Sequence, residues 1–491
     1  MRNREANIAD LPDSSALLPQ APDCSQSPKP DPVATRFPFV LDVETARTFL
    51  RSFKGNSLRA RFVGGVLWST LGAVASQGLT LATSVVVARF LGKAGFGEFG
   101  MIQSTVAMLA IFAGMGLGMT ANKHVAELKW ADPSRAGRMI GLSNVSALVS
   151  GFLLALALFV FSSRLAATVL NAPTLVLELR IAAGLLMLIA INGAQTGTLC
   201  GFEAFKAIAR INIIRGVSAF PVAIAAVWRW GLPGAVCGLA AAEFVSLIFN
   251  YIAVRKECAA HGVSIRYRGS WSERRVLWAF SIPAVVTGAL VAPVAWAANA
   301  ILANQPNGYS ELGVFNAANQ WRSAIIFGAS LLSQPLLPML SNLAAEGRAA
   351  AFKRILTGNL IVTLAASSGI GLVVISLSPW ILRAYGRNFT SGVWVMVLLV
   401  SAAVLSSTVN VIGYAIASLG KMWSSLAFNA VWAPVLFSSA WLLVPRYGAM
   451  GLAEAVFISY VVHVVLVGGY TWLVLRPSSF AVGRPAASDS L

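Results

Sequence analysis

Three arginines stand within or directly beside apolar runs long enough to cross a membrane, and they are the strongest candidates for chemistry in this sequence. Arg89 ends the first run, Arg215 lies early in the fifth, and Arg322 lies well inside the eighth. A charge placed at the centre of a membrane helix costs about 2.5–3.5 kcal/mol, so it needs a partner or a function. Because a guanidinium binds two phosphate oxygens at once, these positions favour an anionic, phosphorylated ligand.

Polar neighbours extend this candidate site. Asn319 and Gln320 accompany Arg322, and Asn319 shares a helix face with it because the two are three residues apart. Gln77 belongs to a polar stripe in the first run, and Glu243 lies in the middle of the sixth. We predict that Glu243 pairs with an arginine or, alternatively, exchanges protons.

Each candidate also has a purely structural interpretation. Arg89 is equally typical of an anchor at the membrane interface, and Arg215 of a shifted helix boundary. For Arg322 the alternative is a buried structural pair. The polar stripes around Gln77 and Asn410 suit either sugar hydroxyls or helix packing, and the lone His463 is interpreted as a hydrogen-bonded packing residue.

Motifs for other chemistry are missing from the sequence. It contains no Walker motif and no GxSxG, and His124, His261 and His463 have no ligand spacing. The four cysteines form no CxxC pair, which gives no support to a zinc site or a disulfide framework. We therefore predict a protein that is not an enzyme and that uses no cofactor or metal.

Composition places these residues in a membrane. Of the 491 residues 57% are apolar and only 11% are charged, which is too few to cover a water-soluble surface. A soluble enzyme, a DNA-binding regulator and a secreted disulfide scaffold are thereby disfavoured. The net charge of +18 does not indicate nucleic acid, because the basic residues lie between apolar runs.

Apolar runs of about 20 residues predict an all-α polytopic membrane protein with about twelve transmembrane helices. Lys and Arg concentrate in alternate loops, so we expect both termini on the cytoplasmic side, and we place the multi-pass protein in the inner (cytoplasmic) membrane. The predicted helices are 64–88, 99–121, 139–162, 180–201, 211–229, 234–254, 277–302, 312–340, 355–378, 391–417, 422–444 and 449–474.

The predicted helices divide the chain into five parts. Residues 1–60 are a proline-rich, disordered cytoplasmic tail, and residues 476–491 are a second cytoplasmic tail. Two six-helix lobes, 61–254 and 277–475, are joined by a basic cytoplasmic linker at 255–276.

An internal repeat relates the two lobes. Gly-Phe-Gly-Glu-Phe-Gly at 95–100 resembles Gly-Tyr-Ser-Glu-Leu-Gly at 308–313, and Gly231-Leu-Pro-Gly234 resembles Gly448-Ala-Met-Gly451. A weaker match relates 127–138 to 346–354. Since each lobe has an even number of helices, the repeat is parallel, as in carriers whose halves enclose a cleft open to alternate sides.

The segment from Val85 to Gly100, followed by Gly114-Met-Gly-Leu-Gly118, resembles the opening of Wzx-type polysaccharide-biosynthesis flippases. These belong to the multidrug/oligosaccharidyl-lipid/polysaccharide (MOP) superfamily, which includes the MATE transporters. The resemblance continues through Arg322 and Gln334-Pro335 and covers about residues 60–475.

The resemblance implies export of an undecaprenyl-pyrophosphate-linked oligosaccharide, such as an O-antigen, exopolysaccharide or capsule unit, to the outer leaflet. The implied partners are this lipid-linked substrate, membrane lipids, and a polysaccharide polymerase with its chain-length machinery; no nucleic acid is expected. The alternatives are a cation-coupled multidrug exporter of the same superfamily and a lipid II-type flippase. The multidrug exporters typically carry a carboxylate in the first or seventh helix, and 64–88 and 277–302 have none.

Overall fold

The computed structural model describes residues 58–114, 116–274, 282–333 and 335–474. These ranges are almost entirely helical and contain no strand, which confirms the all-α prediction. The two predicted tails fall almost wholly outside the described residues and stay predictions.

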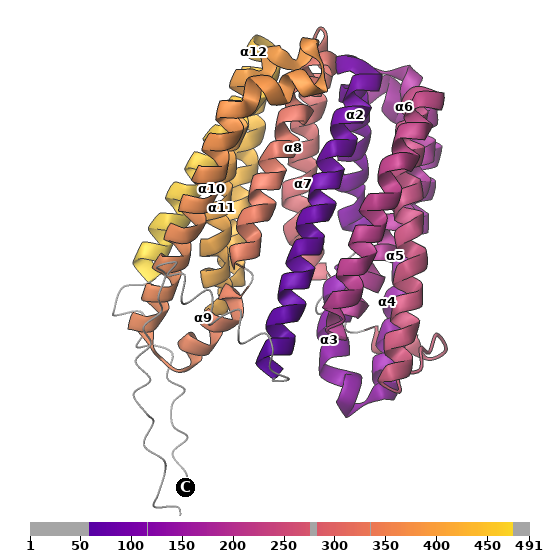
Figure 1. The fold of residues 1–491 in the computed structure, drawn as a ribbon, viewed down its shortest axis with the longest axis vertical. Helices are drawn as coiled ribbons and strands as arrows, with labels where there is room; N and C mark the ends of the chain where they lie inside the picture. The colour runs from indigo at the N-terminus through magenta and orange to yellow at the C-terminus, as the bar shows by residue number, and fades with distance from the viewer. Residues whose placement is uncertain (1–57, 115, 275–281, 334, 475–491) are drawn as a thin grey trace, which may run out of the picture. The chain divides into compact units, whose positions relative to one another are not determined.

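The first half of the described chain forms five long helices, which we call the N-lobe. Figure 1 shows them in indigo to magenta on one side of the bundle. They are α2 (Leu58–Gly114), α3 (Leu117–Ala131), α4 (Pro133–Arg164), α5 (Val176–Gly201) and α6 (Phe205–Ala260), with a short π-helix at Leu165–Val169 and a 3₁₀ turn at Pro173–Leu175.

The second half, drawn in red to yellow, forms the C-lobe (Figure 1). It consists of α7 (Ile282–Ala303), α8 (Gly308–Ser333), α9 (Leu336–Ala345), α10 (Ala349–Tyr385), α11 (Val393–Ser418) and α12 (Met422–Val474), with a 3₁₀ helix at Arg387–Gly392. A further 3₁₀ turn, Ser270–Glu273, lies in the linker between the lobes.

Three helices are too long for one membrane crossing. The helices α2, α6 and α12 contain 57, 56 and 53 residues, and a straight helix of that size would run roughly 80 Å against a hydrocarbon core of about 30 Å. Each is broken at one glycine with positive φ: Gly92, Gly231 and Gly448. Among the described residues seven helices are long and apolar enough to cross a membrane, or eight with the bent pair α8–α9. Counting α2, α6 and α12 twice because of their breaks gives up to eleven crossings, and the shorter apolar helix α7 would be the twelfth, which is consistent with the prediction.

Two of these breaks show the internal repeat directly. Gly231 has φ 61° and ψ −131°, and Gly448 has φ 56° and ψ −131°. Three residues after each break, a Cβ on Gly234 would lie 2.0 Å from the carbonyl oxygen of Ala226, and one on Gly451 would lie 2.3 Å from that of Leu443. The same turn is therefore built twice, at equivalent places in the two lobes.

The lobes meet through the glycine-rich segments of the repeat. A Cβ on Gly97 would lie 1.8 Å from the carbonyl oxygen of Tyr309, and one on Gly313 would lie 2.0 Å from that of Lys93. These contacts are reciprocal, so Gly97 is equivalent to Gly313. The sequence offset between Gly97 and Gly313 is three residues longer than the offset between the matched segments 95–100 and 308–313. It is one residue shorter than the offset between Gly231 and Gly448.

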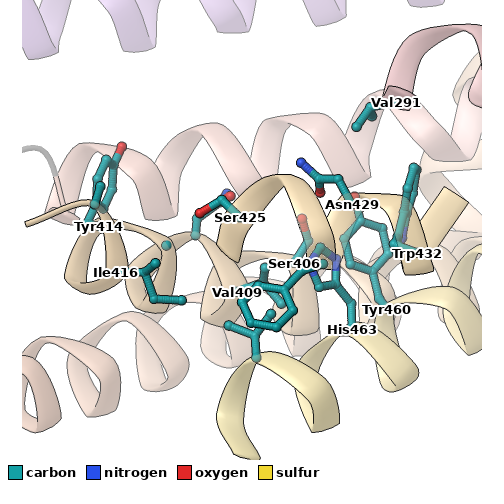
Figure 2. A pocket seen from close by; sticks show the side chains of 15 residues that line it. Val291, Ser406, Val409, Tyr414, Ile416, Ser425, Asn429, Trp432, Tyr460 and His463 are labelled. Carbon is teal, nitrogen blue, oxygen red and sulfur yellow. The ribbon is translucent and has the colours of Figure 1, made fainter. Parts of the chain in front are cut away.

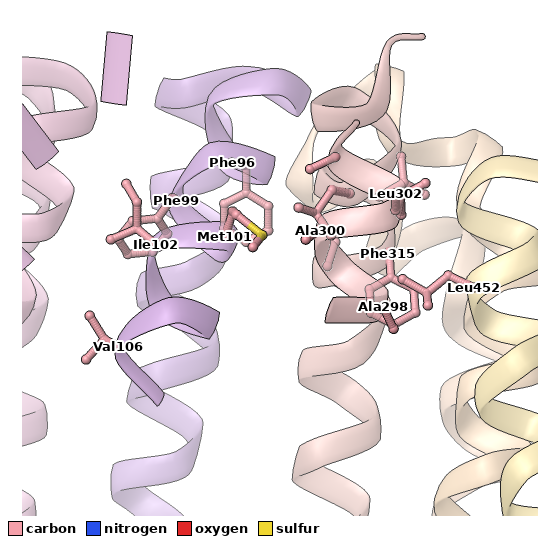
Figure 3. Close-up of a cluster of buried hydrophobic side chains, with 14 of the residues drawn as sticks. Phe96, Phe99, Met101, Ile102, Val106, Ala298, Ala300, Leu302, Phe315 and Leu452 are labelled. Atoms are coloured by element: carbon pink, nitrogen blue, oxygen red, sulfur yellow. The ribbon is translucent and has the colours of Figure 1, made fainter. Parts of the chain in front are cut away.

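Apolar side chains surround this contact. Figure 3 shows Phe96, Met101 and Ile102 of α2 in the same buried cluster as Ala298 and Leu302 of α7, Phe315 of α8 and Leu452 of α12. The Phe96 ring also lies 6.1 Å from those of Tyr385 and Phe389. Burial of these large aromatic rings makes this an apolar joint between the lobes.

Hydrogen bonds between the lobes lie at the same end of the bundle. Trp296 Nε1 donates to Thr105 Oγ1 at 3.0 Å, and Asn299 Nδ2 donates to Ser104 Oγ at 3.0 Å. The hydroxyl of Tyr309 donates to the carbonyl oxygen of Leu170 at 2.6 Å. The lobes are therefore closed at this end, while α3 and α9 lie at the opposite end (Figure 1).

The linker is attached to the N-lobe. The backbone N–H of Arg266 donates to the carbonyl oxygen of Gly137 at 3.1 Å. The Glu273 carboxylate pairs with Arg135 at 3.2 Å and with Arg138 at 3.3 Å. The basic segment predicted as a linker is thus held on the first turns of α4.

Candidate functional site

Arg322 is held between two helices of the C-lobe. Its Nη1 donates to Asn319 Oδ1 at 3.1 Å on the same helix, as their spacing predicts, and its Nη2 donates to the Tyr460 hydroxyl of α12 at 3.0 Å. The guanidinium also lies 5.2 Å from the centre of the Tyr460 ring, within cation–π range. Its Nε–H has no partner within the described residues.

No carboxylate of the described ranges pairs with Arg322. Asn319 and Tyr460 hold the guanidinium in place without cancelling its charge, and Nε–H is left to donate. This is the arrangement that an anionic ligand requires. The structural alternative for Arg322, a buried pair, has no carboxylate partner among the described residues, and a role of Arg322 in binding stays a prediction.

Arg215 lies in the N-lobe and forms an ion pair with Glu243, both on α6. Asn192 of α5 donates to Glu243 Oε2 at 2.8 Å, and Asn250 donates to Asn192 Oδ1 at 3.2 Å. The side chain of Glu243 is only 11% exposed, whereas that of Arg215 is 45% exposed. The pairing predicted for Glu243 is confirmed, and the partly exposed guanidinium keeps donors that can reach a ligand.

The other three candidates, Arg89, Gln320 and Gln77, make no hydrogen bond or ion pair with these two groups among the described residues. Arg89 reaches the C-lobe, where its Nε donates to the carbonyl oxygen of Ala384 at 2.5 Å, in the last turn of α10. It therefore helps to close the lobes. Gln320 has a buried Oε1 without a partner in the described chain, and Gln77 is half-buried on α2. Their roles in binding stay predictions.

The C-lobe contains a pocket that was not predicted from the sequence. Its volume is about 410 Å³, and it lies between α11, the two halves of α12 and Val291 of α7. Figure 2 shows Asn429, Trp432, Tyr460 and His463 around it. Helix periodicity was the signal that could have found it, since Ser425, Asn429 and Trp432 share one face of α12, and Tyr460, His463 and Val467 share another.

The Arg215–Glu243 pair allows a test that separates stability from transport. Arg215→Ala leaves the buried Glu243 carboxylate without its counter-charge, so we expect a lower unfolding temperature in detergent. The loss should be smaller than the about 3–5 kcal/mol of a fully buried pair, because Arg215 is 45% exposed.

The double variant Arg215→Ala/Glu243→Gln removes the unpaired charge and should regain most of the stability. Transport should stay low in both variants if Arg215 also binds the ligand. If transport returns together with stability, Arg215 has only a structural role.

The sequence profile of the family described as "Polysaccharide biosynthesis protein" matches residues 62–344, more than half of the chain. The chain belongs to this family.

Two curated relatives resemble this member of the polysaccharide biosynthesis family over most of its length. The EPS I polysaccharide export inner membrane protein of Ralstonia nicotianae is 26% identical over 414 residues, which covers 82% of this chain and 92% of the relative. The lipid III flippase of Escherichia coli K12 is 24% identical over 418 residues, covering 82% of this chain and 96% of that protein.

Solved structures support the fold. The lipid II flippase MurJ in an inward closed conformation superposes with a TM-score of 0.67 at 12% identity, covering 84% of this chain and 89% of MurJ. An inward-facing MATE transporter of the MOP superfamily superposes with a TM-score of 0.64 at 12% identity, covering 90% of this chain and 99% of the transporter. The polysaccharide biosynthesis family member therefore has the two-lobed MOP fold and is a multi-pass membrane protein.

Proposed function

We propose that this protein is a flippase that moves a lipid-linked oligosaccharide from the inner to the outer leaflet of the cytoplasmic membrane. The observation that carries this proposal is the similarity over 82% of the chain to a polysaccharide exporter and to a lipid III flippase. Both relatives are transport proteins by name, and the family match, residues 62–344, covers nearly all of the N-lobe and the first helices of the C-lobe.

The charges of the two lobes suit such a cargo. Arg322 lacks a carboxylate partner in the described structure, and Arg215 is partly exposed beside its buried Glu243. In this proposal the two guanidinium groups bind the pyrophosphate of an undecaprenyl carrier, one from each lobe, while the polyprenyl chain stays in lipid. Charge–charge attraction in a low-dielectric cleft makes such contacts strong.

Transport follows from rocking of the lobes about their closed end. We infer that both termini lie in the cytoplasm, so that the closed end faces outward and the end with α3 and α9 faces the cytoplasm. An interior-negative potential favours outward movement of negative charge by about 2.3 kcal/mol per charge per 100 mV. No ATP site is needed for this step. A polymerase with its chain-length machinery would receive the flipped unit.

A deletion strain tests the proposal. We expect undecaprenyl-linked oligosaccharide to accumulate on the cytoplasmic face while the surface polymer is lost, and re-expression of the gene should reverse both effects. Mass spectrometry of the extracted lipid would give the sugar unit. An unchanged lipid-linked pool together with new sensitivity to cationic drugs would contradict the proposal and favour a multidrug exporter.

A further inference from the structure

The pocket of the C-lobe lies close to Arg322 but is built from different chemistry. It extends along α11 from Ala417, next to the end of the helix, up to Ser406, about 16 Å away at 1.5 Å per residue. This places it in the half of the C-lobe that is remote from the closed end of the lobes. Its volume of about 410 Å³ falls in the range of about 300–1,000 Å³ that is usual for small-ligand sites.

Two buried polar atoms of the pocket, one of them the indole N–H of Trp432, have no hydrogen-bond partner among the described residues. Trp432 is 5% exposed and His463 is 7% exposed, and neither Trp432 Nε1 nor His463 Nδ1 makes a hydrogen bond there. A buried polar group without a partner costs about 1–3 kcal/mol. Both side chains line the pocket, so a ligand with hydroxyl groups would satisfy them. This corrects the interpretation of His463 as hydrogen-bonded packing, as far as Nδ1 is concerned.

The other lining residues define the class of ligand. None of the fifteen described residues that line the pocket is Lys, Arg, Asp or Glu, so it suits neither a pyrophosphate nor a metal cation. Asn410 and Asn429 offer amides, and Ser406 and Ser425 offer hydroxyls, which a polyprenyl chain would leave unpaired. The aromatic rings of Trp432 and Tyr460, 5.8 Å apart, provide apolar faces beside these polar groups.

We propose that this pocket binds a neutral sugar ring of the cargo, with its hydroxyls on Asn410, Asn429, Trp432 and His463. The inference rests on the proposed flippase function and adds a sugar site to it. Tyr460 connects the two sites, because its ring lines the pocket while its hydroxyl accepts the hydrogen bond from Arg322 at 3.0 Å. The first sugar of such a lipid is bonded to the pyrophosphate, so the sugar site must adjoin the phosphate site.

Binding to two lipids tests the sugar site. The full-length protein in lipid nanodiscs is titrated with the lipid-linked oligosaccharide extracted from the deletion strain, and separately with sugar-free undecaprenyl pyrophosphate. Asn410→Ala and Asn429→Ala should each weaken binding of the glycolipid roughly five- to tenfold, the value of one or two hydrogen bonds. Their affinity for the sugar-free lipid should match that of the wild type.

Two further variants control the comparison. Asn342→Ala changes an exposed asparagine of α9, away from the pocket, and should alter neither affinity. Trp432→Phe keeps an aromatic ring, although a smaller one, and removes the indole N–H, so it should weaken binding of the glycolipid alone even if the alanine variants fold poorly.

The outcomes separate the sugar site from the function. Equal effects of the pocket variants on both lipids, or no effect on either, would overturn the sugar site and leave the flippase proposal standing. Equal affinity of the wild-type protein for the two lipids would also overturn the sugar site and leave the flippase proposal standing. A wild-type protein that binds neither lipid would overturn both proposals.

Discussion

Replacement of Arg322 by alanine is expected to abolish export of the lipid-linked oligosaccharide while the protein stays in the membrane at its normal level. Within the described residues the side chain makes hydrogen bonds only to Asn319 and Tyr460 and lies over the Tyr460 ring, so its loss leaves no buried carboxylate without a counter-charge. A charge-assisted hydrogen bond contributes about 1.5–3 kcal/mol, so loss of two contacts to phosphate should lower transport at least a hundredfold. Complementation of surface polymer in a deletion strain, with immunoblots of membrane fractions, measures both quantities.

Two conservative variants show which property of Arg322 is needed. Arg322→Lys keeps the charge but cannot form the planar fork, so we expect partial activity. Tyr460→Phe keeps the ring beneath the guanidinium and removes one anchor, so it should reduce transport less than Arg322→Ala. Full complementation by Arg322→Ala would refute the assignment of this arginine to the pyrophosphate.

A methyl group at the contact between the lobes should also have a large effect. In Gly313→Ala the new Cβ would lie 2.0 Å from the carbonyl oxygen of Lys93, which is backbone and cannot turn away. Overpacking of this kind costs about 1–3 kcal/mol, which corresponds to a shift of roughly five- to a hundredfold away from the state closed at this end. We expect slower transport and greater access of solvent between the lobes.

Labelling measures that access. Ser104→Cys lies at the joint, where Ser104 accepts a hydrogen bond from Asn299, and it should react faster with a membrane-impermeant maleimide when Gly313→Ala is present. Gly328→Ala is the matched control, because a Cβ there meets only Ile370 of α10, at 4.0 Å. Equal labelling rates in Gly313→Ala and Gly328→Ala would show that the lobes do not rely on this close approach.

The helices could be predicted because each reflects a local property of the sequence. Every predicted helix overlaps a helix of the structure, because an apolar run of about 20 residues has few alternative structures to a membrane helix. The break between the fifth and sixth helices was placed at 230–233, and the structure has it at Gly231. Glycine adopts the required positive φ without steric cost, which makes such breaks visible in the sequence.

Contacts between helices that are distant in the sequence could not be predicted as readily. The pairing of Asn319 with Arg322 follows from their spacing on one helix, but the contact with Tyr460 depends on how α8 and α12 are rotated about their axes. The contact of Arg89 was even harder to predict from the sequence. Its partner, Ala384, lies 295 residues away in the other lobe, and no periodicity of the first helix contains that information.

The reciprocal contact of Gly97 and Gly313 has the form of an isologous interface, in which equivalent residues of two identical subunits meet across a two-fold axis. In such an interface every substitution acts twice, once from each side. Within this single chain, a larger residue at either Gly97 or Gly313 would push the same two helices apart, so the close approach of the lobes needs a glycine from each side.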